Sequence, residues 1–140
     1  MKDIRPALRA LLLGDATVSG LVGGVRIHVV RLPQGQRAAS IVLSRISEGA
    51  DYHMAGASGL AQTRMQVDSW AEDPDDAATL GNAVYDRLSG FRGPVSWGSN
   101  SPQDEIQIGG IFFDQGREDF DDVSELYRMS RDYLIWYAER

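Results

Sequence analysis

The most regular pattern of hydrophobic and polar positions lies near the middle of the chain. Met65 and Val67 are apolar, whereas the residues that alternate with them are polar or charged, namely Arg64, Gln66 and Asp68. Because successive side chains of a strand point to opposite faces, this alternation predicts a half-buried strand. Its apolar face must supply part of the core, which leaves the polar face to solvent or to another molecule.

Helical signals lie on both sides of this strand. Residues 2–13 carry apolar side chains at helical spacing, and Gly14 is expected to end that helix. Asp15 is placed to cap a second, short helical turn. Residues 73–76 (DPDD) supply a capping oxygen, a proline suited to a first turn, and negative charge at the positive end of the helix dipole. The apolar stripe that follows predicts an amphipathic helix: Ala77, Leu80, Val84 and Leu88.

Four further segments have the composition of strands, namely residues 25–30, 40–46, 105–113 and 125–138. The paired glycine at 109–110 predicts a bulge. Three other segments lack this composition. Residues 48–62 are small and polar, which predicts a loop or a long hairpin tip, and residues 90–103 are rich in glycine, proline and serine. The acidic residues 114–122 predict a loop.

This order of elements predicts an α+β fold with a mainly antiparallel sheet. We expect two main helices packed on one face of the sheet, and extended loop or hairpin arms. The chain of 140 residues is expected to form one domain over residues 1–140. Strands this long leave edges and arms that a partner subunit can cover.

The composition narrows the classes of function. The chain has no cysteine, which excludes disulfides, thiol catalysis and thiolate metal sites. A net charge of −6 with Lys2 as the only lysine argues against a protein that grips a nucleic-acid backbone. No segment approaches the roughly 18 apolar residues of a membrane span. We expect a protein without membrane contact that is synthesised in the cytoplasm.

Two patterns point weakly to chemistry. Asp51 and His53 share one face of a strand and, with His28, offer three ligands of the kind that zinc prefers. The segment from Asp114 to Glu125 begins and ends as a calcium loop does, but its sixth position is Asp119 where glycine is expected. Packing and a solvated acidic loop explain these residues more simply. A small metal-dependent hydrolase that uses Asp51, His53 and the acidic loop stays an alternative, as does a regulatory binding domain.

A resemblance to a known family emerges from the order and spacing of several short segments, which cover roughly residues 3–90. They are residues 8–12 (LRALL), 22–27 (VGGVRI), 32–35 (LPQG), 41–43 (IVL), the glycines at 56 and 59 with Leu60, the strand 64–70 (RMQVDSW) and the helix 77–88. The final strand fits more loosely at residues 131–133. In this pattern the chain resembles the tail-completion, or tail-terminator, family of long-tailed bacteriophages and of phage-derived particles such as gene transfer agents.

The resemblance implies a structural protein without a cofactor rather than an enzyme. It implies a homo-oligomer, a hexameric ring that ends the tail tube, and two protein partners: the major tail tube protein and the head–tail connector, or stopper, protein. DNA is expected to pass through the lumen without specific binding, because phosphate contacts would retard it. The protein is then expected in the virion or phage-like particle at the head–tail junction. A head-completion or stopper protein is the alternative within this class.

Two sets of residues are candidates for these contacts. The interface candidates lie in the small polar segment and on the polar face of the central strand: Asp51, His53, Met54, Leu60, Arg64, Gln66 and Asp68. The candidates for an acidic lumen or rim lie in the acidic segment: Asp114, Glu118, Asp119, Asp121 and Asp122.

Overall fold

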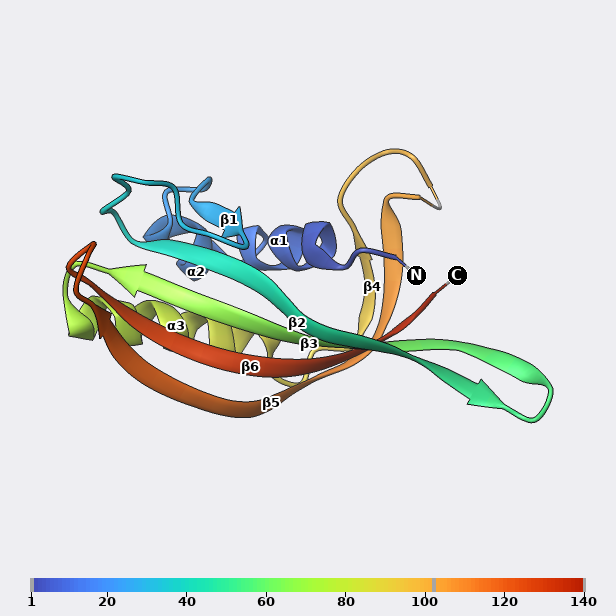
Figure 1. The fold of residues 1–140 in the computed structure, drawn as a ribbon. Helices are drawn as coiled ribbons and strands as arrows, with labels where there is room; N and C mark the ends of the chain where they lie inside the picture. Colours follow the sequence, from blue (N-terminus) through green and yellow to red (C-terminus); the bar gives the residue numbers. More distant parts are fainter. Residues whose placement is uncertain (1, 102, 140) are drawn as a thin grey trace.

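A mixed sheet with helices against it forms the body of the protein in a computed structural model that describes residues 2–101 and 103–139 (Figure 1). Within these residues the sheet has six strands in the order β1-β2-β3-β6-β5-β4. The strands are β1 (Ile27–Val29), β2 (Ser40–His53), β3 (Gly56–Ala71), β4 (Gly93–Ser96), β5 (Glu105–Asp121) and β6 (Leu126–Ala138). The helices are α1 (Arg5–Leu13), α2 (Ala16–Leu21) and α3 (Pro74–Leu88).

The strands confirm the α+β prediction. Only β1 and β2 run parallel, and the other four neighbouring pairs are antiparallel. Strand β3 lies at the centre, where it pairs with β2 along one side and with β6 along the other. The predicted bulge is present as a register shift between Ile108 and Gly110. The short strand β4, within the glycine- and proline-rich segment, was not predicted from the sequence.

The helix boundaries follow the signals in the sequence. The amide of Gly14 donates to the carbonyl of Ala10 over 2.9 Å, at the end of α1. The carboxylate of Asp15 accepts from the amide of Val18 at 3.1 Å and so caps α2. Asp73 caps α3 by accepting from the amide of Asp75 at 2.8 Å. Each cap satisfies backbone groups that the helix itself leaves without partners.

The apolar face of the sheet carries the core. Met65 of β3 lies opposite Tyr133 of β6, and both are fully buried. Helix α3 covers these central strands with its predicted stripe, Ala77, Leu80, Val84 and Leu88. Helix α1 has its main contacts with α2, α3 and β4. The simple arrangement of two main helices on one face is therefore not confirmed. The part of the chain that the structure describes contains no helix long and apolar enough to span a membrane.

Residues 48–62 form most of a two-stranded arm and not a loop. Strand β2 continues to His53, β3 begins at Gly56, and only a tight turn joins them. In Figure 1 this arm extends beyond the body of the molecule, in green. Of the two predictions for this segment, the long hairpin is therefore the correct one. Cross-strand backbone pairing sustains it, although its residues are small and polar.

The prediction of an acidic loop at residues 114–122 is wrong, because β5 runs through Asp121 and pairs with β6 along its whole acidic part. The reason lies on the partner strand. Arg128 of β6 stands opposite Asp119, so the acidic side chains have cations within reach. Asp114 itself lies in a register shift between Phe113 and Gln115. Ladder pairing here outweighs the weak strand propensity of aspartate.

The close approach of α3 to the sheet depends on Gly81. A Cβ at this position would lie 2.7 Å from Cγ of Met129, whereas a Cβ at Gly20 in α2 would meet no atom within 4 Å. We expect Gly20→Ala to stabilise the protein by up to about 1 kcal/mol through helix propensity. We expect Gly81→Ala to lower the free energy of unfolding by about 1 kcal/mol, because the clash with Met129 outweighs the gain in helix propensity. Urea unfolding measures both, and equal effects of the two variants would contradict this packing.

A second prediction concerns Tyr133, which is fully buried in the core. Burial raises its pKa to about 12. The folded state thus holds the phenolic proton more tightly than the unfolded state, whose tyrosine pKa is about 10. The resulting stability is complete below about pH 10 and is lost as the pH rises toward about 12. We expect Tyr133→Phe to lose less stability than the parent chain between about pH 8 and about pH 11. Tyr52→Phe, at an exposed position, should behave as the parent does.

Candidate assembly surface

The face of the sheet opposite α3 carries polar side chains of β3. Arg64, Gln66 and Asp68 lie there, as the alternation in the sequence predicts. Asp132 of β6 lies beside Gln66 in the register, so two strands contribute to the same face. Asp68 and Asp132 are almost fully buried, at 4% and 6% exposure. Buried carboxylates require nearby cations or hydrogen-bond donors, and arginines of this face supply them.

Arg64 connects three strands at one end of this face. Its Nη1 atom lies 2.6 Å from Oδ2 of Asp114, on β5, and 3.3 Å from Oδ2 of Asp132, on β6. The register shift in β5 is what brings Asp114 to this position. Hydrogen bonding to Asp114 raises the pKa of the Arg64 guanidinium. Arg64 is thus engaged by carboxylates of its own chain.

Arg128 has the corresponding role at the other end of the face. It donates from both Nε and Nη2 to the carboxylate of Asp119, and this hydrogen bonding lowers the pKa of Asp119. Its Nη1 atom lies 3.7 Å from Oδ2 of Asp68, and its guanidinium stacks 5.3 Å from the ring centre of Trp70. Gln66 donates to both oxygens of Asp68 at 3.0 Å. The buried Asp68 therefore has both a cation and hydrogen-bond donors.

These contacts explain where the acidic candidates lie. Asp114 and Asp119 are held by Arg64 and Arg128. Asp121 accepts from the hydroxyl of Ser124 at 2.6 Å and from its amide at 2.9 Å, in the turn between β5 and β6. Glu118 and Asp122 are exposed, and among the described residues neither has an ion-pair partner.

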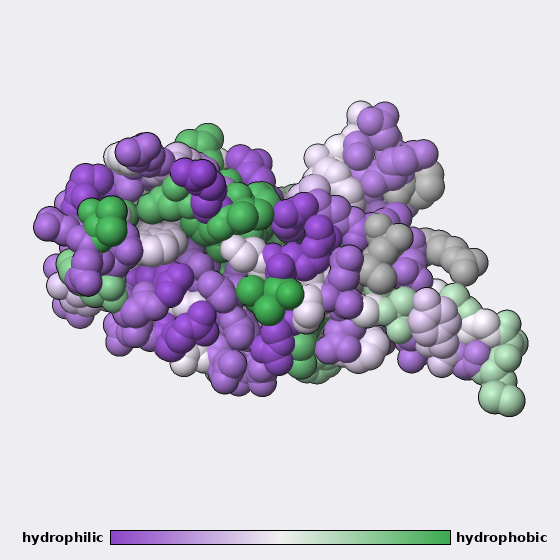
Figure 2. All heavy atoms as spheres, viewed as in Figure 1, coloured by the Kyte–Doolittle hydropathy of each residue, from purple (hydrophilic) through white to green (hydrophobic). Residues whose placement is uncertain are grey.

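The remaining interface candidates lie on the arm. Met54 is at its turn and is fully exposed, and Leu60 is 45% exposed. Tyr52 is also exposed, at 72%. Asp51 and His53 lie on the same short stretch of β2. Figure 2 shows the arm at lower right, where most atoms are white or pale green. The structure thus divides the interface candidates between the arm and the polar face.

The ligands of the suggested metal site do not come together. His28 of β1 stands opposite Val42 of β2, nine residues before Asp51 on the same strand. At about 3.3 Å per residue this separates the two side chains by roughly 30 Å. The acidic part of β5 pairs with the first half of β6, far along the sheet from the arm. No group of three His, Asp or Glu residues that could hold a metal ion occurs within residues 2–101 and 103–139.

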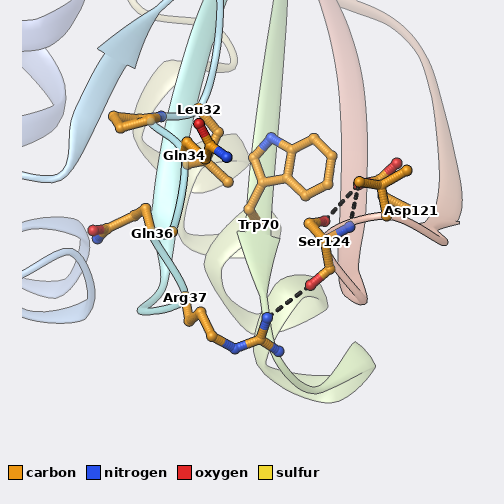
Figure 3. Close-up of a pocket in the computed structure, with 10 residues that line it drawn as sticks. Leu32, Gln34, Gln36, Arg37, Trp70, Asp121 and Ser124 are labelled. Atoms are coloured by element: carbon orange, nitrogen blue, oxygen red, sulfur yellow. Dashed lines mark hydrogen bonds between the residues drawn. The ribbon is translucent and has the colours of Figure 1, made fainter.

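A groove beside Trp70 was not predicted from the sequence (Figure 3). It has a volume of about 450 Å³, and its walls are the loop of residues 32–37 and the turn between β5 and β6. Arg37 closes one end by donating to the carbonyl of Ser124 at 2.7 Å. The LPQG segment at 32–35 belongs to the family resemblance, and it predicted no groove.

Two comparisons with known proteins gave matches, one to a protein family and one to a solved structure. The family model described as tail completion protein gp17 matches residues 6–138. Among solved structures, a chain of the virion of a native gene transfer agent (GTA) particle is similar, with a TM-score of 0.67 and 18% identity. That match covers 94% of this chain and 92% of the other. At this identity the structural match shows a shared fold. No curated protein matches the sequence.

The charge arrangement on the polar face generates a prediction about Arg128. Arg128→Met keeps most of the aliphatic stem but removes the cation beside the buried Asp68. We expect the free energy of unfolding at neutral pH to fall by about 2 kcal/mol. The variant loses charged hydrogen bonds to Asp119 and leaves the buried carboxylate of Asp68 without its nearby cation, and both changes destabilise the folded state. Arg117→Met is the matched control, with an exposed side chain and one bond of 3.3 Å to Gln66. It should change stability by less than about 0.5 kcal/mol. Equal losses in urea unfolding would refute the special role of Arg128.

Proposed function

This chain belongs to the tail completion protein gp17 family, and from this membership we propose that it forms a hexameric ring that ends the tail tube of a phage-like particle. The proposed ring also gives the head-side connector a surface to bind. The family match over residues 6–138 is the observation that carries the proposal. The shared fold with a chain of the GTA virion supports a location in the particle.

The polar face supports a structural role over a catalytic one. Its carboxylates are neutralised by Arg64 and Arg128 within the same chain. An acid–base mechanism needs titratable groups that converge on an open cleft with shifted proton affinities. This face instead offers ion pairs that hold three strands together. We therefore propose no reaction, cofactor or metal for this protein.

The arm is the part of the proposed interface that exposes apolar side chains on a projection from the body. Tyr52, Met54 and Leu60 expose apolar surface on a two-stranded projection. Exposed apolar surface of this kind commonly marks an interaction site. We propose that the arm contacts a neighbouring subunit or the tail tube, with Asp51 and His53 at the same contact. Arg64, Gln66 and Asp68 are proposed to lie on a face that borders a neighbour or the lumen.

Charge supports passage of DNA through the ring without specific binding. The net charge of the chain is −6, and the exposed Glu118 and Asp122 can add negative charge to a rim. DNA is held by cationic side chains that neutralise its phosphates and release counterions. An acidic lumen makes no such contacts and therefore does not retain the DNA. Of the other rim candidates, Asp114, Asp119 and Asp121 are occupied by contacts within the chain.

Native mass spectrometry of the full chain, alone and with tail tubes, tests the ring. We expect a hexamer or a tube-bound ring, and separate pull-downs with tube and connector proteins should show binding to the tube. Monomers under all conditions would overturn the proposal. Binding to the connector protein alone would favour a head-completion or stopper protein.

The arm has its own prediction. Tyr52→Ser combined with Met54→Ser should leave the free energy of unfolding within about 0.5 kcal/mol of the parent, because both side chains are exposed. We expect the fraction of capped tails to fall at least tenfold, measured as tail length in electron micrographs. Tyr85→Ser, at an exposed position of α3 on the opposite face of the sheet, is the control and should cap normally. Normal tail lengths with the arm variant would contradict this role.

A further inference from the structure

The two outer edges of the sheet are open at the same level. Strand β1 ends the sheet on one side, and among the described residues no strand covers its outer edge. On the other side β4 covers only residues 105–108 of β5, and Gly90 and Phe91 bond to Ile111. Beyond Ile111, the structure gives β5 no backbone partner on its outer side among residues 2–101 and 103–139. Strand β1 has three residues, and the amide of Ile27 and the carbonyl of Val29 already bond to Val25 and Arg31. An open strand edge nevertheless pairs readily with another chain unless it is protected.

The register places these open segments at one height in the sheet. Ile27 of β1 is level with Ile41, then with Ser69, then with Met129, and finally with Glu118 of β5. Strand β4 lies at the opposite end of β5, level with the beginning of the arm. One edge therefore has its extra strand where the other edge has none. When two copies are placed side by side in one sheet, β1 of one copy can lie beside the uncovered part of β5 of the other, next to the end of β4.

The strand directions also suit such a junction. Strand β1 is parallel to β2, and three antiparallel pairings lead from β2 to β5. Strands β1 and β5 therefore run in opposite directions. When the sheet continues into a neighbouring copy, β1 of one copy meets β5 of the next in antiparallel orientation, which is the more stable pairing per residue.

The side chains of the two edges are complementary in charge. Residues 25–31 (VRIHVVR) contain two arginines and no carboxylate, whereas residues 117–123 (REDFDDV) contain four carboxylates and one arginine. Asp119 and Asp121 are engaged within the chain, so Glu118 and Asp122 are the carboxylates left for a second copy. Both edges also expose apolar surface. Val25 and Val30 flank β1 and are 65% and 64% exposed. Phe120 of β5 is 45% exposed, and Val123, in the turn after β5, is 95% exposed. Opposite charges and apolar side chains on facing strands stabilise an antiparallel pair.

Backbone strain marks the β1 edge as well. Val30 has φ of +73°, a conformation that β-branched residues rarely adopt. Its amide bonds to the carbonyl of Leu43 at 2.8 Å, and its side chain stays exposed. Strain of this kind is found more often at sites of function than elsewhere.

We propose that the β1 edge of one copy pairs with the β5 edge of the next copy as a continuous antiparallel sheet. The two edges are different surfaces of one subunit, so the contact is heterologous, and repeated rotation closes it into a ring. This inference rests on the proposed ring and names the surfaces that build it. Continuing the register across the junction places Val25 opposite Phe120.

Cysteine cross-linking tests the junction without interference, because the chain has no cysteine of its own. A chain with Val25→Cys and Phe120→Cys, treated with a short bismaleimide, should give a ladder of linked oligomers up to the closed ring. Either single variant should stay unlinked, and a mixture of the two should give linked dimers. Val25→Cys with Gln107→Cys is the control, because β4 covers the outer edge at Gln107.

Charge reversal provides a second readout. Glu118→Arg should lower the apparent association constant at least tenfold, whereas Glu105→Arg, the same change at the covered end of β5, should alter it less than twofold. Thermal unfolding of the monomer shows that both variants are folded. Rings that form without the Val25–Phe120 link and tolerate Glu118→Arg would overturn this junction and leave the proposed function intact. Linkage of Val25→Cys to itself would also overturn it. Monomers with and without tail tubes would overturn both.

Discussion

The pairing of β3 with β2 and β6 is the constraint on which the rest of the structure depends. Because the strand alternates in polarity, fixing its register also fixes which side chains face α3 and which face away. Met65 is thereby buried against Tyr133, while Asp68 is turned to the other side. A shift of one residue would reverse both faces. The core and the polar face are therefore two consequences of one register.

The polar face shows how the protein keeps acidic residues inside a sheet. Asp68 and Asp132 are nearly buried, yet arginines from neighbouring strands lie beside them. These pairs tie β5 to the centre of the sheet, and β5 in turn carries the acidic outer edge. The charges that first suggest a metal loop thus have two roles. Some hold the strand in place, whereas Glu118 and Asp122 are exposed and belong to the edge that we propose a second copy contacts.

The edges of the sheet are suited to the kind of assembly that family membership leads us to propose. A tail completion protein needs surfaces for assembly rather than a site for a reaction. The arm, the β1 edge and the β5 edge are the surfaces that we propose for assembly, and they lie in different parts of one sheet. Their separation would let a subunit contact more than one neighbour at once. Contacts between unlike surfaces are also what a closed ring of identical subunits requires.

The sequence by itself determined the elements whose signals are local. The caps at Asp15 and Asp73, the alternation around Met65 and the bulge near Gly109 depend on neighbouring residues, and they appear where predicted. Only the tertiary structure decided the acidic strand, the two-stranded arm and the open edges. Asp119 lies in a strand because Arg128 stands opposite it on another strand, and Ile27 becomes an edge residue because β1 is last in the sheet. Such features depend on pairing between distant segments, which local propensity does not encode.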